Sequence, residues 1–313
     1  MSLSGKLAYM LWFRPRTCVR RILRNGGPIA SWQIERGRKA MRKAARNLPS
    51  LPVELSASRP LKIHFLTGNR YWEQTAFCSW SLSQQTGRNI HAVVSDDGTL
   101  TLPQMEFIRT SCHEATFISE EEINDRLNTH LPVARFPSLR NRRSNFPLLR
   151  KITDFHVGSS GWKLFLDSDL LFFRDPKFLT EWHDNPLCPL RGEDLENAYG
   201  YPLEFLEELA GRPVDERINT GTLGILSESI DWERMEFWCR SQLERFGSHY
   251  FQEQALVALH LAGQTCAIPP SDEYYLNPKP PEAIECQKTM HHYVADSKRW
   301  YFTHCWQRAL GRR

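Results

Sequence analysis

Two carboxylates one residue apart, Asp167 and Asp169, stand at the end of a short apolar run. That run, residues 163–166, and the apolar residues 170–172 behind the acids are typical of a strand buried on both faces. Ionised carboxylates do not stay in such a core unless they are paired or bind a metal. At the carboxyl end of a parallel strand, where open α/β sheets bind ligands, two oxygen ligands favour Mg²⁺ or Mn²⁺ bound together with a diphosphate. A polar turn that ends a strand is the alternative interpretation.

The segments before these acids predict the sheet that positions them. Apolar runs at residues 62–67, 89–95 and 116–118 have the length of strands, and a helix ended by Gly87 is expected at residues 72–85. Strands and helices that alternate with short connections predict an α/β fold with a mostly parallel central sheet flanked by helices. Because no G-x-G-x-x-G fingerprint follows the first strand, a dinucleotide-binding fold is not favoured.

The charge distribution separates a basic N-terminal extension from the rest of the 313-residue chain. Residues 1–50 hold twelve Lys or Arg and one acid, so their net charge is +11 against +4 overall, which leaves −7 for the remainder. We expect a basic extension and linker at residues 1–60 and a catalytic domain at residues 61–313. A helix capped by Ser31 is expected at residues 31–48. Its charges indicate peripheral contact with an anionic membrane or a solvated helix packed on the body.

Cysteine usage and hydropathy indicate the compartment. Eight cysteines occur without a C-x-x-C pair, which favours reduced thiols in a cytosolic protein. No apolar run approaches the roughly 20 residues that span a bilayer, and the run at residues 7–13 is too short for a signal peptide. We therefore expect a cytoplasmic protein, with peripheral attachment at the inner face of the membrane through residues 1–50. Few aromatic residues accompany the charges of this extension, so nucleic-acid binding is not favoured.

Three charged side chains distant in sequence could complete a site around the two acids. Arg150 lies in a basic helix expected at residues 147–157, directly before the strand that carries the acids, and could bind an anion held there. His292 could add an imidazole ligand to a metal site, and Lys298 could hold a diphosphate as a point charge. Each of them also has an ordinary structural interpretation, as a solvated or packed residue.

Taken together, these motifs resemble those of the retaining GT-A glycosyltransferases of family 8, which include glycogenin and bacterial lipopolysaccharide hexosyltransferases. Residues 292–300 look like the family's H-x-x-G-x-x-K-P-W, with Ala295 for the glycine and Arg299 for the proline. Asp167-Ser168-Asp169 matches the D-x-D, and Arg150 lies 17 residues before it, where members carry an Arg or Lys that contacts the donor.

Three more segments extend the resemblance over residues 61–306. A strand expected at residues 218–226 opens with a polar loop similar to the family's N-x-G, and a helix expected at residues 251–261 begins with a variant of D-Q-x-x-L. The residues concerned are Asn219-Thr220-Gly221 and Glu253-Gln254-Ala255-Leu256, with Glu in place of Asp. Thr67 and Tyr71 stand where members set residues around the nucleotide base, but Gly68 replaces an Asp or Asn often found there.

The resemblance implies a GT-A (nucleotide-diphospho-sugar transferase) fold and a metal-dependent hexosyltransferase. The donor would be a nucleotide-diphosphate sugar, UDP-sugar favoured, and the acceptor a glycan or glycolipid, with retention expected and polysaccharide biosynthesis at a bacterial surface as the setting. It implies Mn²⁺ or Mg²⁺ on Asp167, Asp169 and His292. The residues implied to contact the donor are Thr67, Tyr71, Arg150, Ser168, Gly221 and Lys298, and those implied at the transferred sugar are Asn219, Glu253 and Gln254.

Two other functions fit parts of the pattern. A haloacid-dehalogenase-like phosphotransferase or phosphatase would use Asp167 as the nucleophile of its own D-x-D, although that motif normally lies near the start of its domain. A GT-A domain without turnover would bind a nucleotide sugar or a glycan, and the departures at Gly68, Ala295 and Arg299 permit this.

Overall fold

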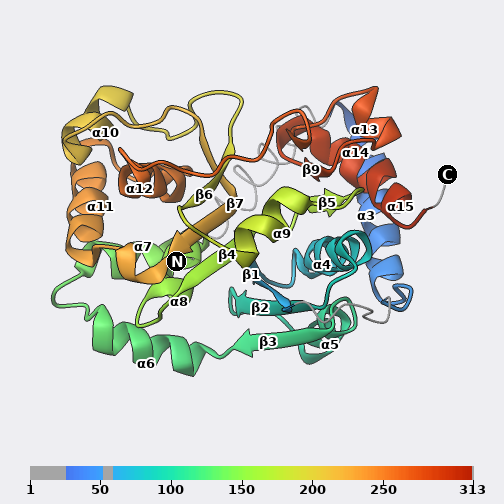
Figure 1. The fold of residues 1–313 in the computed structure, drawn as a ribbon, viewed down its shortest axis with the longest axis horizontal. Coiled ribbons are helices and arrows are strands. Elements are labelled where there is room, and N and C mark those ends of the chain that lie inside the picture. Colours follow the sequence, from blue (N-terminus) through green and yellow to red (C-terminus); the bar gives the residue numbers. More distant parts are fainter. Residues whose placement is uncertain (1–25, 52–58, 312–313) are drawn as a thin grey trace, which may run out of the picture.

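A six-stranded sheet forms the centre of the computed structural model, which describes residues 26–51 and 59–311 (Figure 1). The strand order is β3-β2-β1-β4-β7-β6. The strands are β1 (Leu61–Thr67), β2 (Ile90–Asp96), β3 (Glu114–Ile118), β4 (Trp162–Leu166), β6 (Leu190–Glu193) and β7 (Ile218–Leu226). β1 pairs in parallel with β2 and β4, and β2 with β3, whereas β7 runs antiparallel to β4 and β6. The predicted mostly parallel α/β sheet is therefore confirmed.

Helices cover both faces of this sheet because its strands are apolar on both faces. Leu61, Ile63 and Phe65 of β1 enter one core, whereas His64 points the other way and contacts Phe155 edge-on. The first core takes residues from α3 (Pro28–Ala45), α4 (Trp72–Thr86), α5 (Leu102–Arg109), α9 (Lys177–Asp184) and the C-terminal helices. The second takes them from α6 (Glu120–His130), α7 (Pro137–Asn145), α8 (Arg150–His156), α10 (Leu203–Ala210), α11 (Trp232–Phe246) and α12 (Gln252–Leu261).

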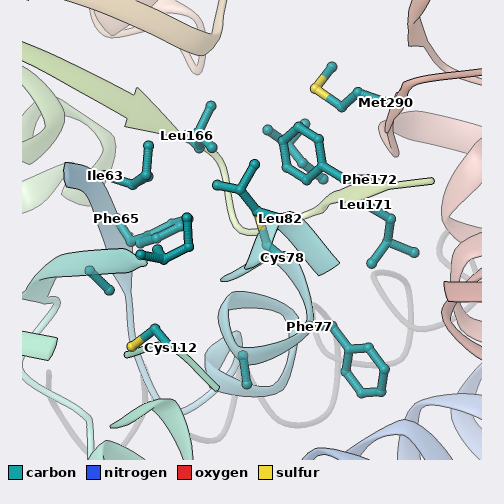
Figure 2. Packing of buried hydrophobic residues seen from close by; sticks show 14 of the residues in the cluster. Ile63, Phe65, Phe77, Cys78, Leu82, Cys112, Leu166, Leu171, Phe172 and Met290 are labelled. Atoms are coloured by element: carbon teal, nitrogen blue, oxygen red, sulfur yellow. The ribbon is translucent and has the colours of Figure 1, made fainter. Parts of the chain in front are cut away.

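A second, three-stranded sheet places His292 beside Asp167 and Asp169. β5 (Leu170–Phe172) pairs antiparallel with β9 (Met290–His292), which pairs with β8 (Tyr274–Leu276). Its register sets Leu170 opposite His292. Figure 2 shows that Leu166 before the acids and Leu171 and Phe172 behind them pack in the core over α4. This apolar anchoring on both sides fixes the turn at residues 167–169.

The C-terminal segment after β9 folds over α4 and α3. It comprises η4 (Ala295–Ser297), α14 (Lys298–Trp300), the π-helix η5 (Tyr301–Cys305) and α15 (Trp306–Ala309), with the short α13 (Glu282–Glu285) beside it. Phe77 of α4 meets Trp306 edge-on, and Tyr293 and Tyr301 are fully buried. In the described ranges all seven cysteines are free thiols.

Three sequence-based expectations were wrong in detail. The helix expected to begin at Ser31 begins at Pro28, which needs no hydrogen bond to its nitrogen at the first helical position, so Ser31 is no cap. The helix expected at residues 147–157 is divided into the 3₁₀ turn η2 (Pro147–Leu149) and α8. Asn219, Thr220 and Gly221 lie inside β7 instead of in a loop.

The one described helix of the basic extension, α3, packs closely on the domain. At Gly37 a side chain would overlap the backbone of Phe302, so glycine permits the close approach of α3 to η5. Arg38 and Arg42 each donate to the fully buried Glu73 carboxylate at 3.0 Å. No described helix has the length and hydropathy to cross a bilayer. The rest of the predicted extension, residues 1–25 and 52–58, lies outside the described residues.

Candidate active site

Asp167, Asp169 and His292 converge at the carboxyl end of β4. Their ligand atoms all lie within 4.8 Å of one another. His292 Nε2 is 3.3 Å from Asp169 Oδ1 and 3.7 Å from Asp167 Oδ2. This nitrogen is buried and has no hydrogen-bond partner among the described residues. A buried imidazole nitrogen without a partner, facing two carboxylates, fits a divalent cation such as Mn²⁺ or Mg²⁺, because these groups can all donate electron pairs to one ion.

Gly221 makes room for this triad. A side chain at position 221 would overlap the imidazole of His292, so only glycine allows the ring to lie against β7. The carbonyl of Gly221 also accepts a hydrogen bond from the backbone N–H of Asp167 at 2.8 Å. β7 therefore positions two of the three candidate ligands through one residue.

Two lysines neutralise the carboxylates. Lys151 Nζ lies 2.7 Å from Asp167 Oδ1, and Lys298 Nζ lies 2.5 Å from Asp169 Oδ2. Burial disfavours the charge of Asp169, but Lys298 and His292 outweigh this and hold the pKa of its carboxyl well below the ordinary value. Burial likewise opposes the charge of Lys151, but Asp167 and Glu253 raise its pKa. Asp169 is thus held ionised, and a lysine ammonium lies beside each acid.

Glu253, in the first turn of α12, is a buried acid on another wall of the site. Its Oε2 accepts a hydrogen bond from the Thr220 hydroxyl at 3.0 Å, whereas Oε1 is buried without a partner among the described residues. Burial raises the pKa of Glu253 to about 7, although Lys151 opposes this change. The group can therefore exchange a proton near neutral pH.

Asp194, at the end of β6, orients the two predicted amide side chains. Its Oδ2 accepts hydrogen bonds from Asn219 Nδ2 at 3.0 Å and from Gln254 Nε2 at 3.4 Å. Gln254 also donates to the carbonyl of Ala198. These hydrogen bonds fix the orientation of both amide groups, including the amide oxygen of Gln254. The amide oxygen of Asn219 accepts a hydrogen bond from the backbone N–H of Gly221 at 2.9 Å.

Most of these residues line one cavity of about 660 Å³. Of the predicted site residues, its walls include Asp167, Asp169, Asn219, Gly221, Glu253, Gln254, His292 and Lys298. Lys151, Asp194 and the exposed Tyr250 line it as well, and none of the three is among the predicted site residues. Asp194 stands at the same edge of the sheet because β6 runs in the same direction as β4, but no strand is predicted at residues 190–193, so the sequence offers no signal for this acid.

The other predicted donor contacts lie beside the cavity. The hydroxyls of Thr67, Thr75 and Ser168 bind one another at 2.7 and 2.8 Å in a buried chain. Tyr71 is 42% exposed at the start of α4. Arg150 donates to the carbonyl of Asp96 at 3.0 Å, so the neighbouring Lys151, and not Arg150, touches the D-x-D. Roles for these residues in nucleotide binding remain predictions.

Solved glycosyltransferases share this fold. The galactosyltransferase LgtC, in complex with donor and acceptor sugar analogues, is 16% identical, with a TM-score of 0.51 over 80% of this chain and 95% of that chain. Mouse xyloside xylosyltransferase 1 is 10% identical, with a TM-score of 0.50 over 76% and 98%. The bifunctional glycosyltransferase WbbM is 13% identical with a TM-score of 0.49, and the match spans about half of its length, 52%.

No protein-family model and no curated protein matches the sequence itself. At such low identity the solved structures establish the architecture alone. That architecture is a mostly parallel central sheet flanked by helices. The resemblance read from the motifs is confirmed at this level: the chain has the GT-A glycosyltransferase fold and is divergent in sequence from the members it resembles.

Proposed function

We propose that this protein is a metal-dependent hexosyltransferase that uses a nucleotide-diphosphate sugar, UDP-sugar favoured, as donor. The observation that carries the proposal is the convergence of Asp167, Asp169 and His292 on the wall of a cavity that also holds Glu253. Mn²⁺ or Mg²⁺ bound by these three ligands would supply Lewis-acid stabilisation of the charge that develops on the diphosphate.

The other residues of the cavity have roles that follow from their charge and position. Lys151 and Lys298 lie beside the two acids and would attract the phosphate oxygens of the donor and of the leaving nucleoside diphosphate. Asn219 and Gln254, oriented by Asp194, would hydrogen-bond the hydroxyls of the transferred sugar. The apolar side chains and Tyr250 that line the cavity would help to exclude water.

Retention of configuration is the stereochemical outcome that we propose. Glu253 is a buried carboxyl near Lys151, on a different element from the metal triad. In that position its carboxylate can stabilise positive charge at the anomeric carbon or attack it, whereas an inverting enzyme needs a base beside the acceptor hydroxyl. The Thr220 hydroxyl holds one of its oxygens in place, and Oε1 has no hydrogen-bond partner among the described residues.

We further propose a glycan or lipid-linked acceptor, met at an anionic membrane surface on the cytoplasmic side. The support is the exposed stripe of α3, whose inner face packs on the domain. The stripe has two large apolar residues at its start and cations behind them, at helical spacing: Ile29, Trp32, Arg36, Lys39, Lys43 and Arg46.

A panel of UDP-, GDP- and ADP-hexoses tests the function. The full-length protein should release the nucleoside diphosphate from one of them in Mn²⁺ and not in a chelator. Asp169→Asn should abolish this release and Mn²⁺ binding while the fold is kept, because the carboxylate serves ligation. The matched control is Asp125→Asn, on the exposed surface of α6. Unchanged release by Asp169→Asn would contradict the metal site.

The same assays separate the two alternatives. Tight nucleotide-sugar binding without release or transfer would indicate a binding domain instead of an enzyme. Liberation of inorganic phosphate from simple phosphomonoesters would indicate a phosphotransferase with Asp167 as nucleophile. The second alternative finds no support in the solved structures described above, which are glycosyltransferases.

A further inference from the structure

Two thiols meet where the C-terminal segment packs against α13. Cys286 caps the end of α13 and Cys305 is the last residue of η5, and these two helices are in contact. Both thiols donate to the same backbone carbonyl, that of Ala283, Cys305 Sγ at 3.0 Å and Cys286 Sγ at 3.9 Å. The Cys286 thiol also hydrogen-bonds the Cys305 thiol. Two sulfurs held at one acceptor and against each other are close enough for small side-chain rotations to join them.

The backbone of Cys286 has a conformation that is unfavourable for any residue with a side chain. Its φ is +53°, in the left-handed region. The residue that ends a helix in this conformation is commonly glycine, which has no Cβ atom to clash with the backbone. A cysteine at this strained position therefore favours a role for the thiol itself.

A cavity of about 270 Å³ gives small molecules access to the pair. Cys286 lines this cavity and is 9% exposed, whereas Cys305 is fully buried. Arg308 lines the same cavity, and its guanidinium would attract the carboxylates of a small peptide disulfide. Such a reagent would meet Cys286 first, and the neighbouring Cys305 could then displace it.

The two cysteines enclose the part of the chain that brings His292 and Lys298 to the candidate active site. His292 ends β9 and Lys298 begins α14, and both lie between Cys286 and Cys305 in the sequence. A bond between the two sulfurs would close this segment into a loop and tie α13 to η5. Such a cross-link stabilises a fold chiefly by restricting the unfolded chain.

We propose that Cys286 and Cys305 form a reversible disulfide by exchange with a small oxidised thiol of the glutathione disulfide class. Cys286 attacks one sulfur of that disulfide and releases one thiol, and Cys305 then attacks the mixed disulfide and releases the second. The protein loses two electrons and two protons, which convert the small disulfide into two thiols. Metal binding by the pair is not indicated, because the one group of three close ligand atoms in the described ranges is that of the candidate active site. The modification does not depend on the proposed sugar transfer.

Differential alkylation of the full-length protein tests this modification. The protein is equilibrated at pH 8 with mixtures of reduced and oxidised glutathione, its free thiols are alkylated, and its peptides are identified by mass spectrometry. The Cys305 thiol and burial raise the pKa of Cys286 well above its ordinary value, so exchange is slow and the incubation must be long. We expect one peptide pair, joined through Cys286 and Cys305, which dithiothreitol separates.

Thermal unfolding tests the consequence of closing the loop. Oxidation should raise the unfolding temperature of the unaltered protein by roughly 5 °C. Cys286→Gly should lose this response, although its reduced form should be at least as stable as the unaltered protein, because glycine relieves the left-handed conformation. The matched control is Cys112→Ala, which removes another buried thiol that donates to backbone carbonyls, and it should keep the response.

Alkylation of both Cys286 and Cys305 at every glutathione ratio would overturn the proposal, as would a disulfide from either cysteine to a different partner. An equal rise in the unfolding temperature of oxidised Cys286→Gly would do the same. None of these outcomes bears on Mn²⁺ binding at the candidate active site, which the comparison of Asp169→Asn with Asp125→Asn tests separately.

Discussion

Glu253 is a buried carboxyl whose protonation makes the stability of the fold depend on pH. Its pKa is about 7 in the folded protein against an ordinary value of 4.5, so the folded state retains a proton that the unfolded state has released. The resulting stabilisation is fully present below pH 4.5 and is lost as the pH rises to 7. From this group the free energy of unfolding should fall by on the order of 3 kcal/mol across that interval.

The substitution Glu253→Gln should remove this dependence. Urea unfolding in a chelating buffer at pH 5 and pH 8 measures it, with Glu244→Gln, exposed on α11, as the control. We expect the free energy of unfolding of Glu253→Gln to exceed that of the unaltered protein at pH 8 but not at pH 5, because an amide needs no deprotonation. Parallel pH profiles for the variant and the unaltered protein would show that Glu253 titrates normally.

Lys151 and Arg150 are neighbours with different surroundings, and this predicts different kinetic effects. Lys151 touches Asp167, whereas Arg150 donates to the carbonyl of Asp96 at the end of β2. Removing a positive charge that faces the leaving group costs about a hundredfold in turnover. Lys151→Met should therefore lower kcat by about that factor, while Arg150→Met should mainly raise KM for the donor. Steady-state kinetics with Mn²⁺ measures both, and a larger loss of kcat in Arg150→Met would reverse the assignment.

At the scale of single elements, the turn after β9 contains local backbone strain. Ala295 stands where the motif of the resembled family has glycine, and its φ is +44°, in the left-handed region. Ala295→Gly should relieve this and raise the free energy of unfolding by about 0.5–1 kcal/mol, the steric relief being partly offset by the greater entropy of the unfolded chain. Thermal unfolding measures the change.

A matched substitution in a helix gives the opposite sign. Ala40 is exposed in the middle of α3, where glycine costs about 1 kcal/mol relative to alanine. Ala40→Gly should therefore lower the unfolding temperature, whereas Ala295→Gly raises it. A decrease in both variants would mean that the left-handed conformation of Ala295 carries no strain.

The strands and the D-x-D turn were predictable from sequence because their signals are local. The runs in β1, β2 and β4 are apolar and are followed by glycine or acids. These strands and β7 lie within a residue or two of their predicted places. The convergence of His292 on Asp167 depends instead on the pairing of β5 with β9, more than a hundred residues apart, and no local pattern encodes that pairing. Only the motif resemblance linked these residues in the sequence.

Three predicted donor-binding residues are not among the residues that line the cavity, and the direction of their side chains accounts for this. Arg150, at the start of α8, donates to the carbonyl of Asp96, whereas the next residue, Lys151, contacts Asp167. Thr67 and Ser168 stand at the predicted edge, but their hydroxyls bind Thr75. Such orientation depends on local backbone geometry and on partners from other elements, which a linear pattern does not contain.

At the scale of the whole molecule, charge is concentrated on the outer face of α3. If this face meets an anionic surface, each lysine or arginine near it contributes about 1 kcal/mol to binding. Sedimentation with vesicles of phosphatidylglycerol and phosphatidylcholine should recover the protein at low salt and release it at high salt. Lys39→Glu combined with Lys43→Glu should reduce recovery, and Glu204→Lys with Glu208→Lys on α10 is the control of equal size. Equal recovery of both double variants would locate membrane contact elsewhere.

The contacts of α3 also predict how far the chain can be shortened. Met41 and Ala45 are fully buried against the domain, and Glu73 of α4 holds Arg38 and Arg42. Deletion of residues 1–25 leaves all these contacts in place. Deletion of residues 1–50 exposes the apolar surface under α3 and removes both arginine partners of the Glu73 carboxylate. The longer deletion should therefore lower the free energy of unfolding by about 3 kcal/mol or more relative to the shorter one.

Thermal and urea unfolding of the two truncated proteins measures this difference, and Gly37→Leu in the full chain should reproduce part of it. Position 37 faces the backbone of Phe302 without room for a side chain, so leucine there should push α3 away from η5. Since α4 begins directly after Tyr71, loosening α3 should also weaken UDP binding. If both truncated proteins unfold at the same temperature and bind UDP equally, α3 does not belong to the catalytic domain, and the domain begins near residue 61 as its sequence predicts.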